Sequence, residues 1–283
     1  MDKKKLKLFL YNLIFIIGGI ALCYPFISRY LYDQASRVEV NTYQEAVQQL
    51  SINEVDRRIF LAQAYNDQLS QQKEGVSKIS DPFSTKDHEE GRAAYAHMLE
   101  INEQIGTIEI PKINEELPVF AGTGEEVLQK GIGHLEGTSL PIGGKHTHSV
   151  LTGHRGLPNA RLFSNLDKLK KDDIFYFKNL SETLAYKVDR IDVILPDEIE
   201  YLDIVPNQDY MTLITCTPYM INSHRLLVRG HRVPYTEEEY DKEVKTSTHF
   251  FMKYRWLLAL LLLILILLII FWQSNRKKVK HRK

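Results

Sequence analysis

The strongest constraint on the fold of this 283-residue chain is a pair of apolar runs, one near each end. Residues 8–27 are apolar apart from Tyr11, Asn12, Cys23 and Tyr24, and residues 256–272 carry no charge. An apolar helix of about 17–25 residues can span a bilayer. Tryptophans bracket the second run, as aromatic residues do at a membrane interface. We therefore expect a membrane helix at each end and a domain of roughly 220 residues between them.

Basic residues lie on the outer side of each apolar run, in "MDKKKLK" before the first and "QSNRKKVKHRK" after the second. Positive charge favours the cytoplasmic side, so both termini are expected inside and the central domain outside. The first run could instead be a signal peptide, but the bulky "ALCYPFISRY" offers no small-residue cleavage site and favours a retained anchor. Leu22 is too large for a lipoprotein site at Cys23, which we interpret as a structural thiol at the membrane.

Charge and cysteine content narrow the class of protein further. The 36 basic side chains balance 36 acidic ones. This balance argues against a nucleic-acid partner, since that would require a basic surplus. The chain has two cysteines, so Cys216 would have no disulfide partner in the outer domain. A lone thiol outside the cytoplasm suggests that the thiol is used.

The central part of the sequence changes from a helical to a strand pattern. Residues 41–72 carry an apolar stripe typical of helices, with Ser51 and Glu54 placed to cap a second helix, and another short helix is expected at 89–100. From residue 105 the chain alternates, beginning with a predicted hairpin over 106–122. Five further strand-like segments are "HSVLTGH", "DIFYFKN", "ETLAYKVDRIDVI", "YMTLITC" and "RLLVRGHRV". Six to eight strands with few helices between them favour a closed or nearly closed, mainly β barrel.

Three residues near strand ends suggest chemistry. Cys216 ends "TLITC", His154 follows "VLTG", and Arg225 lies nine residues after the cysteine, at the start of the next strand. A cysteine attacks as its thiolate, which a nearby histidine or arginine stabilises. Arginine cannot act as a base, but it can hold a substrate carbonyl or a developing oxyanion. The three residues together predict acyl transfer through a thioester.

Plainer interpretations of the same residues are open at this point. A single cysteine in an apolar run is more often a core residue than a nucleophile. His154 alone would be an ordinary loop histidine. His134, His146, His148 and His154 could form a metal site, but no cysteine or carboxylate completes a zinc spacing, so we expect no metal and no cofactor.

The motifs resemble those of the sortases, membrane-anchored cysteine transpeptidases of Gram-positive bacteria. The resemblance covers residues 106–233 and rests on "TLITCTPY", on Arg225 and on "TGHRG". It implies an eight-stranded sortase-type β-barrel. It also implies that Cys216 is the nucleophile, His154 the general acid and base, and Arg225 the residue that positions the substrate and holds the oxyanion.

Two features resemble the pilus-assembling sortases of class C. These have a second membrane segment at the C-terminus and a lid with an Asp-Pro-aromatic motif, which match residues 256–272 and "DPF" at Asp81, Pro82 and Phe83. The family pattern "CTPYGINTHRLLVRG" is present with Met220 and Ser223 as departures, neither at a catalytic position.

A lid at this tripeptide also makes physical sense. Asp81 could pair with Arg225, and Phe83 could cover the sulfur of Cys216. Pro82 would stiffen the link between them. Without the cysteine motif, the same tripeptide would be an ordinary turn.

The resemblance implies cleavage of LPxTG-like sorting signals and transfer of the acyl group to a lysine of another pilin. The expected partners are pilin subunits and the membrane. Alternatives are a housekeeping sortase that anchors proteins to the cell wall, a cysteine protease that uses water, and a non-enzymatic membrane-tethered scaffold or adhesin. Cys216→Ala would leave the scaffold unaffected.

The expected organisation has seven parts. They are a cytoplasmic basic N-terminus (1–7), a transmembrane anchor or signal-anchor (8–27), a helical region with the lid (28–104), the catalytic barrel (105–235), a tether (236–255), a C-terminal transmembrane helix (256–272) and a cytoplasmic basic tail (273–283).

Overall fold

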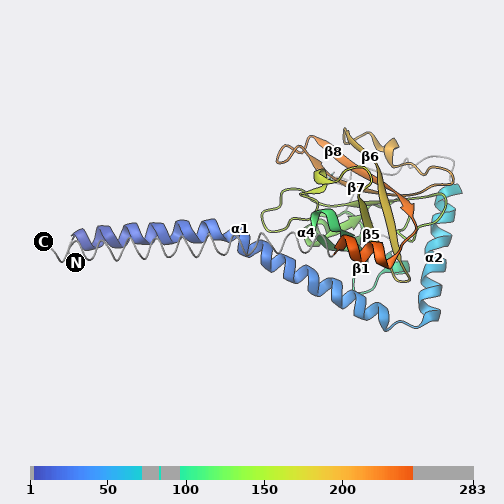
Figure 1. The fold of residues 1–283 in the computed structure, drawn as a ribbon, viewed down its shortest axis with the longest axis horizontal. Coiled ribbons are helices and arrows are strands. Elements are labelled where there is room, and N and C mark those ends of the chain that lie inside the picture. Colours follow the sequence, from blue (N-terminus) through green and yellow to red (C-terminus); the bar gives the residue numbers. More distant parts are fainter. Residues whose placement is uncertain (1–2, 72–82, 84–95, 245–283) are drawn as a thin grey trace. The chain divides into compact units, whose positions relative to one another are not determined.

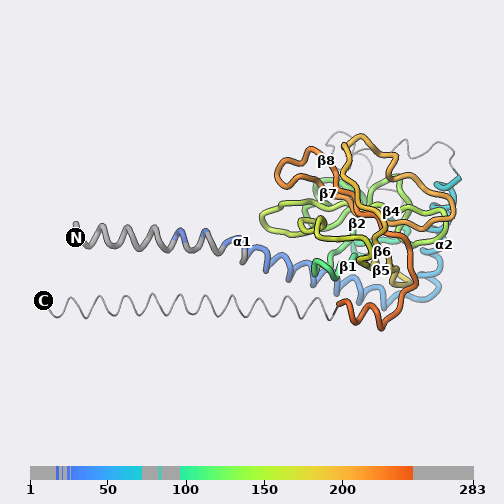
Figure 2. The backbone as a smooth tube through the Cα atoms, turned by 45° about the horizontal axis from the view of Figure 1, so that its top comes forward, coloured from blue at the N-terminus to red at the C-terminus, as the bar shows by residue number. Residues whose placement is uncertain are grey.

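The computed structural model describes residues 3–71, 83 and 96–244 of the chain (Figures 1 and 2). The chain divides into two units, residues 1–235 and 236–283. The first unit holds the helices and strands discussed below. The second is described only for residues 236–244.

The first unit is built on a closed barrel of eight strands in the order β1-β2-β3-β4-β7-β8-β6-β5. Neighbouring strands are antiparallel except for two parallel pairs, β2 with β3 and β4 with β7. This confirms the predicted mainly β, closed barrel. The strands are β1 (Gln104–Ile110), β2 (Glu115–Ala121), β3 (Ile132–His134), β4 (Thr147–Thr152), β5 (Ile174–Lys178), β6 (Thr183–Ile194), β7 (Asp209–Thr217) and β8 (His224–Val233).

The predicted first hairpin is confirmed by the pairing of β1 with β2. Pro111 cannot donate a hydrogen bond to a ladder and opens the short 3₁₀ turn η1 (Pro111–Ile113). Asn114 then takes a left-handed backbone conformation, with φ 54°, which asparagine tolerates better than most residues. The chain thereby reverses and enters β2.

Two helices precede the barrel, α1 (Lys3–Gln48) and α2 (Ile52–Gln71). They meet at Ser51 as predicted, and Ser51 Oγ accepts a hydrogen bond from the backbone N–H of Glu54 (3.2 Å). The Glu54 carboxylate does not complete a capping box, because it pairs instead with Arg57 (3.0 Å) and Arg58 (2.7 Å). Of the helix expected at 89–100, the described part is α3 (Ala96–Leu99).

Both long helices make specific contacts with the part of the chain that forms the barrel. The buried Asn66 of α2 exchanges two hydrogen bonds with the backbone of Leu140, at 2.7 and 3.1 Å, so its amide satisfies both main-chain groups of that residue. On α1, Ser36, Val40 and Tyr43 are buried, and the helix packs against β2. Figure 1 shows α2 running alongside the barrel.

The barrel contains two separate apolar clusters. The large one fills the interior and includes Phe163, Phe175 and Tyr186. The smaller one comprises Leu135, Val150, Ile194, Leu202, Ile214 and Leu227, with Phe83 packed against it. The smaller cluster matters for function because Phe83 belongs to the predicted lid.

The described residues include no helix that is both long enough and apolar enough to cross a bilayer. The predicted C-terminal transmembrane segment, 256–272, lies outside the described residues. The first apolar run, 8–27, lies within α1.

Candidate active site

Cys216 and Arg225 lie opposite each other on the paired strands β7 and β8. Both are buried, with 6% and 7% of their surfaces exposed, and Cys216 forms no disulfide bond. The sequence separation of nine residues therefore closes into direct cross-strand neighbours, because the antiparallel hairpin folds back between them. The structure brings this predicted pair together.

His154 is carried to the same end of the barrel by β4, which runs parallel to β7. The pairing continues past the end of β4, where the backbone N–H of Gly153 donates to the carbonyl of Ile214 (3.1 Å). The buried hydroxyl of Thr215 donates back to the carbonyl of Gly153 (2.8 Å). The residue before the cysteine thus binds the residue before the histidine, so Cys216 at the end of β7 and His154 just after β4 lie at one edge of the barrel.

Gly153 has no space for a side chain. A Cβ atom there would lie 2.6 Å from Ile132 and 2.9 Å from Phe163, closer than carbon atoms can approach. The glycine in "TGH" therefore lets β4 approach β3 and the Phe163 segment closely. This close approach fixes the point at which the chain turns towards His154.

Arg155 provides a second tie between the two segments. Its guanidinium donates to Thr217 Oγ1 (3.0 Å) and to Asp167 Oδ2 (2.7 Å), and it lies 5.9 Å from the ring centre of Tyr219. The residue after the histidine therefore binds the residue after the cysteine. Hydrogen bonds therefore join the two segments both before and after the predicted site residues. Thr215 binds Gly153 before Cys216 and His154, and Arg155 binds Thr217 after them.

The Arg225 guanidinium is oriented by main-chain carbonyls. Its Nη1 donates to the carbonyl oxygens of Asn222 (3.1 Å) and His224 (3.2 Å). A guanidinium has five N–H donors in a planar fork, so bonds from one nitrogen orient the whole group. A positive charge fixed directly across from a thiol is suited to holding a carbonyl oxygen as it gains negative charge.

The described part of the predicted lid is Phe83. Its ring centre lies 5.0 Å from Arg225 Cζ and 5.6 Å from the ring centre of His154. The ring therefore covers the predicted arginine and histidine together, and is anchored on the smaller apolar cluster. Asp81 and Pro82 lie outside the described residues, so pairing of Asp81 with Arg225 stays a prediction, as does contact between Phe83 and the sulfur.

The other histidines of the metal alternative have different surroundings. His134 and His148 are buried in the barrel, and burial lowers the pKa of each to about 4. His134 bonds the backbone of Ser139, and His148 bonds Thr212 and the backbone of Asp203. Over residues 3–71, 83 and 96–244, no group of three or more His, Cys, Asp or Glu side chains is arranged to hold a metal ion. These two buried rings are core groups in polar pairings.

One acidic residue near the site was not predicted from the sequence. Glu125 begins α4 (Glu125–Lys130), and its Oε2 lies 3.5 Å from Nε2 of His154, within ion-pair range but without hydrogen-bond geometry. The Glu125 side chain is 70% exposed, whereas that of His154 is 19% exposed. Nothing in the local sequence signals this approach, because β2, β3 and β4 must first assemble to create it.

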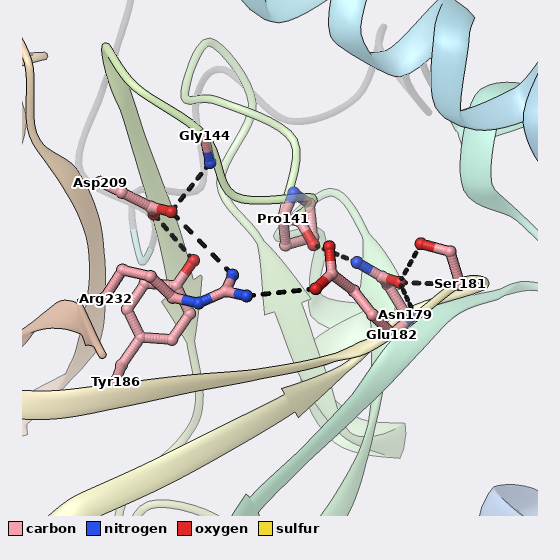
Figure 3. Close-up of polar contacts among 8 residues, drawn as sticks. All are labelled: Pro141, Gly144, Asn179, Ser181, Glu182, Tyr186, Asp209 and Arg232. Atoms are coloured by element: carbon pink, nitrogen blue, oxygen red, sulfur yellow. Dashed lines mark hydrogen bonds and ion pairs between the residues drawn. The ribbon is translucent and has the colours of Figure 1, made fainter. Parts of the chain in front are cut away.

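The opposite end of the same β7–β8 hairpin holds a different polar group, shown in Figure 3. Asp209 accepts hydrogen bonds from the backbone N–H of Gly144 (2.8 Å) and the hydroxyl of Tyr186 (2.9 Å). Arg232 donates to Glu182 (3.2 Å) and lies 4.0 Å from Asp209. Burial raises the pKa of Asp209, and the bonds from Gly144 and Tyr186 oppose that shift. A cavity of about 540 Å³ adjoins this group.

Comparisons of the sequence and the structure with known proteins identify relatives of this chain. A model of the sortase domain matches residues 108–233. The chain is 28% identical to sortase A of Bacillus anthracis, over 82% of this chain and 97% of that protein. Among solved structures, it is similar to sortase C1 of GBS pilus island 1, at 50% identity and TM-score 0.66, covering 71% of this chain and 94% of that one. It is also similar to sortase C-1 of Streptococcus pneumoniae, at 54% identity and TM-score 0.65, covering 70% and 99%.

Proposed function

Because the chain belongs to the sortase family of cysteine transpeptidases, in class C, we propose that it joins pilin subunits into a covalent fibre. The observation that carries the proposal is the cross-strand pair of Cys216 and Arg225, with His154 tied to the same edge by the bond between Thr215 and Gly153. The pilin substrate is inferred from the solved neighbour that is named for a pilus island.

In the first step, the Cys216 thiolate attacks the carbonyl carbon between Thr and Gly of an LPxTG-like signal. The carbonyl oxygen becomes an oxyanion, which the Arg225 guanidinium stabilises by charge and by donated hydrogen bonds. His154 as imidazolium gives its proton to the glycine nitrogen, and the C–N bond breaks. The product is an acyl-thioester on Cys216 and a released amine.

In the second step, a lysine amine of another pilin attacks the thioester carbonyl. His154, now neutral, takes a proton from that amine as the new amide bond forms. The Cys216 thiolate leaves and the enzyme returns to its starting charge state. Net chemistry is the exchange of one amide bond for another, so neither a cofactor nor a metal is required.

Water must compete poorly with lysine for this reaction to build fibres. The low exposure of Cys216 and the apolar ring of Phe83 over Arg225 and His154 support a site that limits access of water. We propose that Asp81, Pro82 and Phe83 form a lid that occupies the substrate position at rest. Incoming signal peptide would displace it.

The proposed setting is the cell membrane, with the barrel of residues 105–235 on the extracytoplasmic side. Anchors at 8–27 and 256–272 are supported by their apolar composition and basic outer flanks. The helical region with the lid (28–104) and the tether (236–255) would connect the anchors to the barrel. This arrangement would hold the thioester close to pilins that emerge from the membrane.

The test is co-expression of the full-length chain with pilins from the same genome, followed by denaturing electrophoresis. Wild type should give a ladder of covalent multimers, and Cys216→Ala should give monomers. A ladder that persists in Cys216→Ala would rule out the thioester. Cleaved monomers in wild type, with water as acceptor, would support a protease, and transfer to a cell-wall precursor would support a housekeeping sortase.

A further inference from the structure

Helix α1 contacts two separate segments of the barrel through adjacent residues. Tyr32 Oη donates to the carbonyl oxygen of Lys130 (2.9 Å), and Asp33 Oδ2 accepts a hydrogen bond from Arg161 Nη2 (3.1 Å). The Asp33 and Arg161 side chains are each 26% exposed, so their pairing is partly shielded from water. Neither contact belongs to the catalytic edge itself.

The first contact leads to His154 through α4. Lys130 is the last residue of this short helix, and Glu125 is its first. The Glu125 carboxylate lies 3.5 Å from Nε2 of His154. Tyr32 therefore holds one end of a six-residue helix whose other end faces the histidine ring.

The second contact leads to His154 through the segment after β4. The backbone N–H of Phe163 donates to the carbonyl of His154 (3.2 Å), and the N–H of Gly156 donates to Ser164 Oγ (3.1 Å). These bonds close the segment into a loop, and Arg161 lies two residues before the closing bond. A displacement of Arg161 would therefore be passed to the backbone of His154.

Arg161 is held between two carboxylates. Besides Asp33, its Nε lies 3.1 Å from Oε1 of Glu115 at the start of β2, an ion pair without hydrogen-bond geometry. Burial raises the pKa of Glu115 to about 8, against the lowering effect of Arg161. The guanidinium of Arg161 therefore connects α1, through Asp33, with the start of β2, through Glu115.

We infer that Tyr32, Asp33 and Arg161 are positioning residues through which α1 fixes the orientation of His154. The need for such a device follows from the fold, because β4 ends at Thr152 and His154 stands on a loop rather than in a strand. Loop positions are less rigid than strand positions. Catalysis is sensitive to geometry at the level of about 1 Å, which can cost roughly 100-fold in rate.

This inference rests on the proposed role of His154 as general acid and base. It assigns to the N-terminal helix a part in the chemistry, in addition to any part in anchoring. The same helix contains the apolar residues 8–27, so the proposed membrane anchor and the proposed support of His154 belong to one continuous helix.

The test compares Tyr32→Phe and Asp33→Asn with the control Glu45→Gln, all in the full-length chain. Both test variants keep the side-chain shape. Tyr32→Phe removes a hydrogen bond and Asp33→Asn removes the charge that pairs with Arg161, while the control removes a charge from an exposed position of the same helix. With a soluble sorting peptide, each test variant should lower kcat roughly 3–10-fold and change KM less than about twofold, since orientation acts on the transition state. The control should match wild type.

A second measurement separates positioning from general destabilisation. In a His154→Ala background the same two substitutions should not lower the residual rate further, because the group that they position is gone. A further loss of the same size in that background would overturn the inference, as would wild-type kcat in both single variants. Near-normal turnover in His154→Ala alone would instead overturn the proposed function. Melting temperatures recorded in parallel show that each variant is folded.

Discussion

The two ends of the β7–β8 hairpin use the same residue type for different purposes. Each end has an arginine on β8, Arg225 at one and Arg232 at the other. Arg232 binds the carboxylate of Glu182 and lies near that of Asp209, which also accepts hydrogen bonds from Tyr186 and Gly144 (Figure 3). At this end, donors and acceptors satisfy one another within the protein.

At the other end, Arg225 is oriented by two backbone carbonyls and covered by an aromatic ring. An apolar ring can be displaced at modest cost. The printed contacts of the two ends differ, because Arg232 binds carboxylates whereas Arg225 lies across from the thiol of Cys216. With Cys216 as the proposed nucleophile, stability and reactivity would be separated along a single pair of strands.

Substitutions of Arg225 are expected to have the largest effect and test the proposed difference between the two ends most directly. We expect Arg225→Ala to lower kcat/KM for a sorting peptide by roughly 10²–10³-fold, since one oxyanion donor is typically worth that much. Alkylation of Cys216 by a thiol reagent should largely persist, because the lost group acts on the substrate. Arg225→Lys should fail as well, since an ammonium cannot reproduce the planar fork. Near-wild-type turnover in either variant would contradict the assigned role.

The folded state should lose stability in acid because of two buried histidines, His134 on β3 and His148 on β4. The folded-state pKa values of His134 and His148, about 4, lie below the ordinary value of 6.5, so both rings favour the folded state when neutral. Their contribution is present above about pH 6.5 and is lost as pH falls towards 4, by about 1.4 kcal/mol for each pH unit that separates the folded and unfolded pKa values. Urea unfolding at pH 7.5, 6, 5 and 4.5 should show a decline of a few kcal/mol. A ring that titrates near 6.5 by NMR in the folded protein would exclude this account.

A substitution at the Arg232 end of the hairpin should lower the stability of the fold and leave the reaction rate nearly unchanged. Arg232→Ala removes the partner of Glu182 and Asp209, and we expect a loss of about 1–2 kcal/mol, because both the arginine and Glu182 are partly exposed. For a domain of this size, that corresponds to a lower Tm by roughly 3–6 °C. Peptide cleavage at 25 °C should stay within about twofold of wild type. A large fall in kcat with an unchanged Tm would mean that this end takes part in the reaction.

The smallest effect should come from removing the side chains of the proposed lid. Asp81→Ala combined with Phe83→Ala removes a ring stacked on Arg225 and a predicted ion pair, together worth about 1–2 kcal/mol. Thiol labelling of Cys216 and hydrolysis of a soluble peptide should each rise about tenfold or less. Stability should change little, since the barrel interior is untouched. Equal labelling rates in wild type and the double variant would show that these residues form a turn with no gating role.

Much of the barrel was predictable because alternation is a local property of the sequence. The hairpin of β1 and β2 and the strands β4 to β8 all carry this pattern. The strand β3 was missed, since its three residues "IGH" are too short to show a period. It exists because β2 and β4 pair with it on either side, a parallel pairing on one side and an antiparallel pairing on the other.

Some features of the candidate site were likewise predictable from local sequence, and others depend on the assembled fold. Cys216, His154 and Arg225 stand at strand ends that the sequence marks, and the family resemblance supplied their proposed roles. Glu125 could not be identified beside His154, because their proximity depends on how α4 and the segment after β4 meet. The pairing of Asp33 with Arg161 joins residues 128 positions apart, and no local pattern encodes it.

The seam between β4 and β7 has an evolutionary consequence. Six paired positions, with the bond from Thr215 to Gly153 beyond them, fix the spacing of β4 and β7. That connection includes β5, β6 and the surface loop before β7, where insertions and exchanges can accumulate. A change of length in the loop before β7 would therefore leave the spacing of β4 and β7 unchanged.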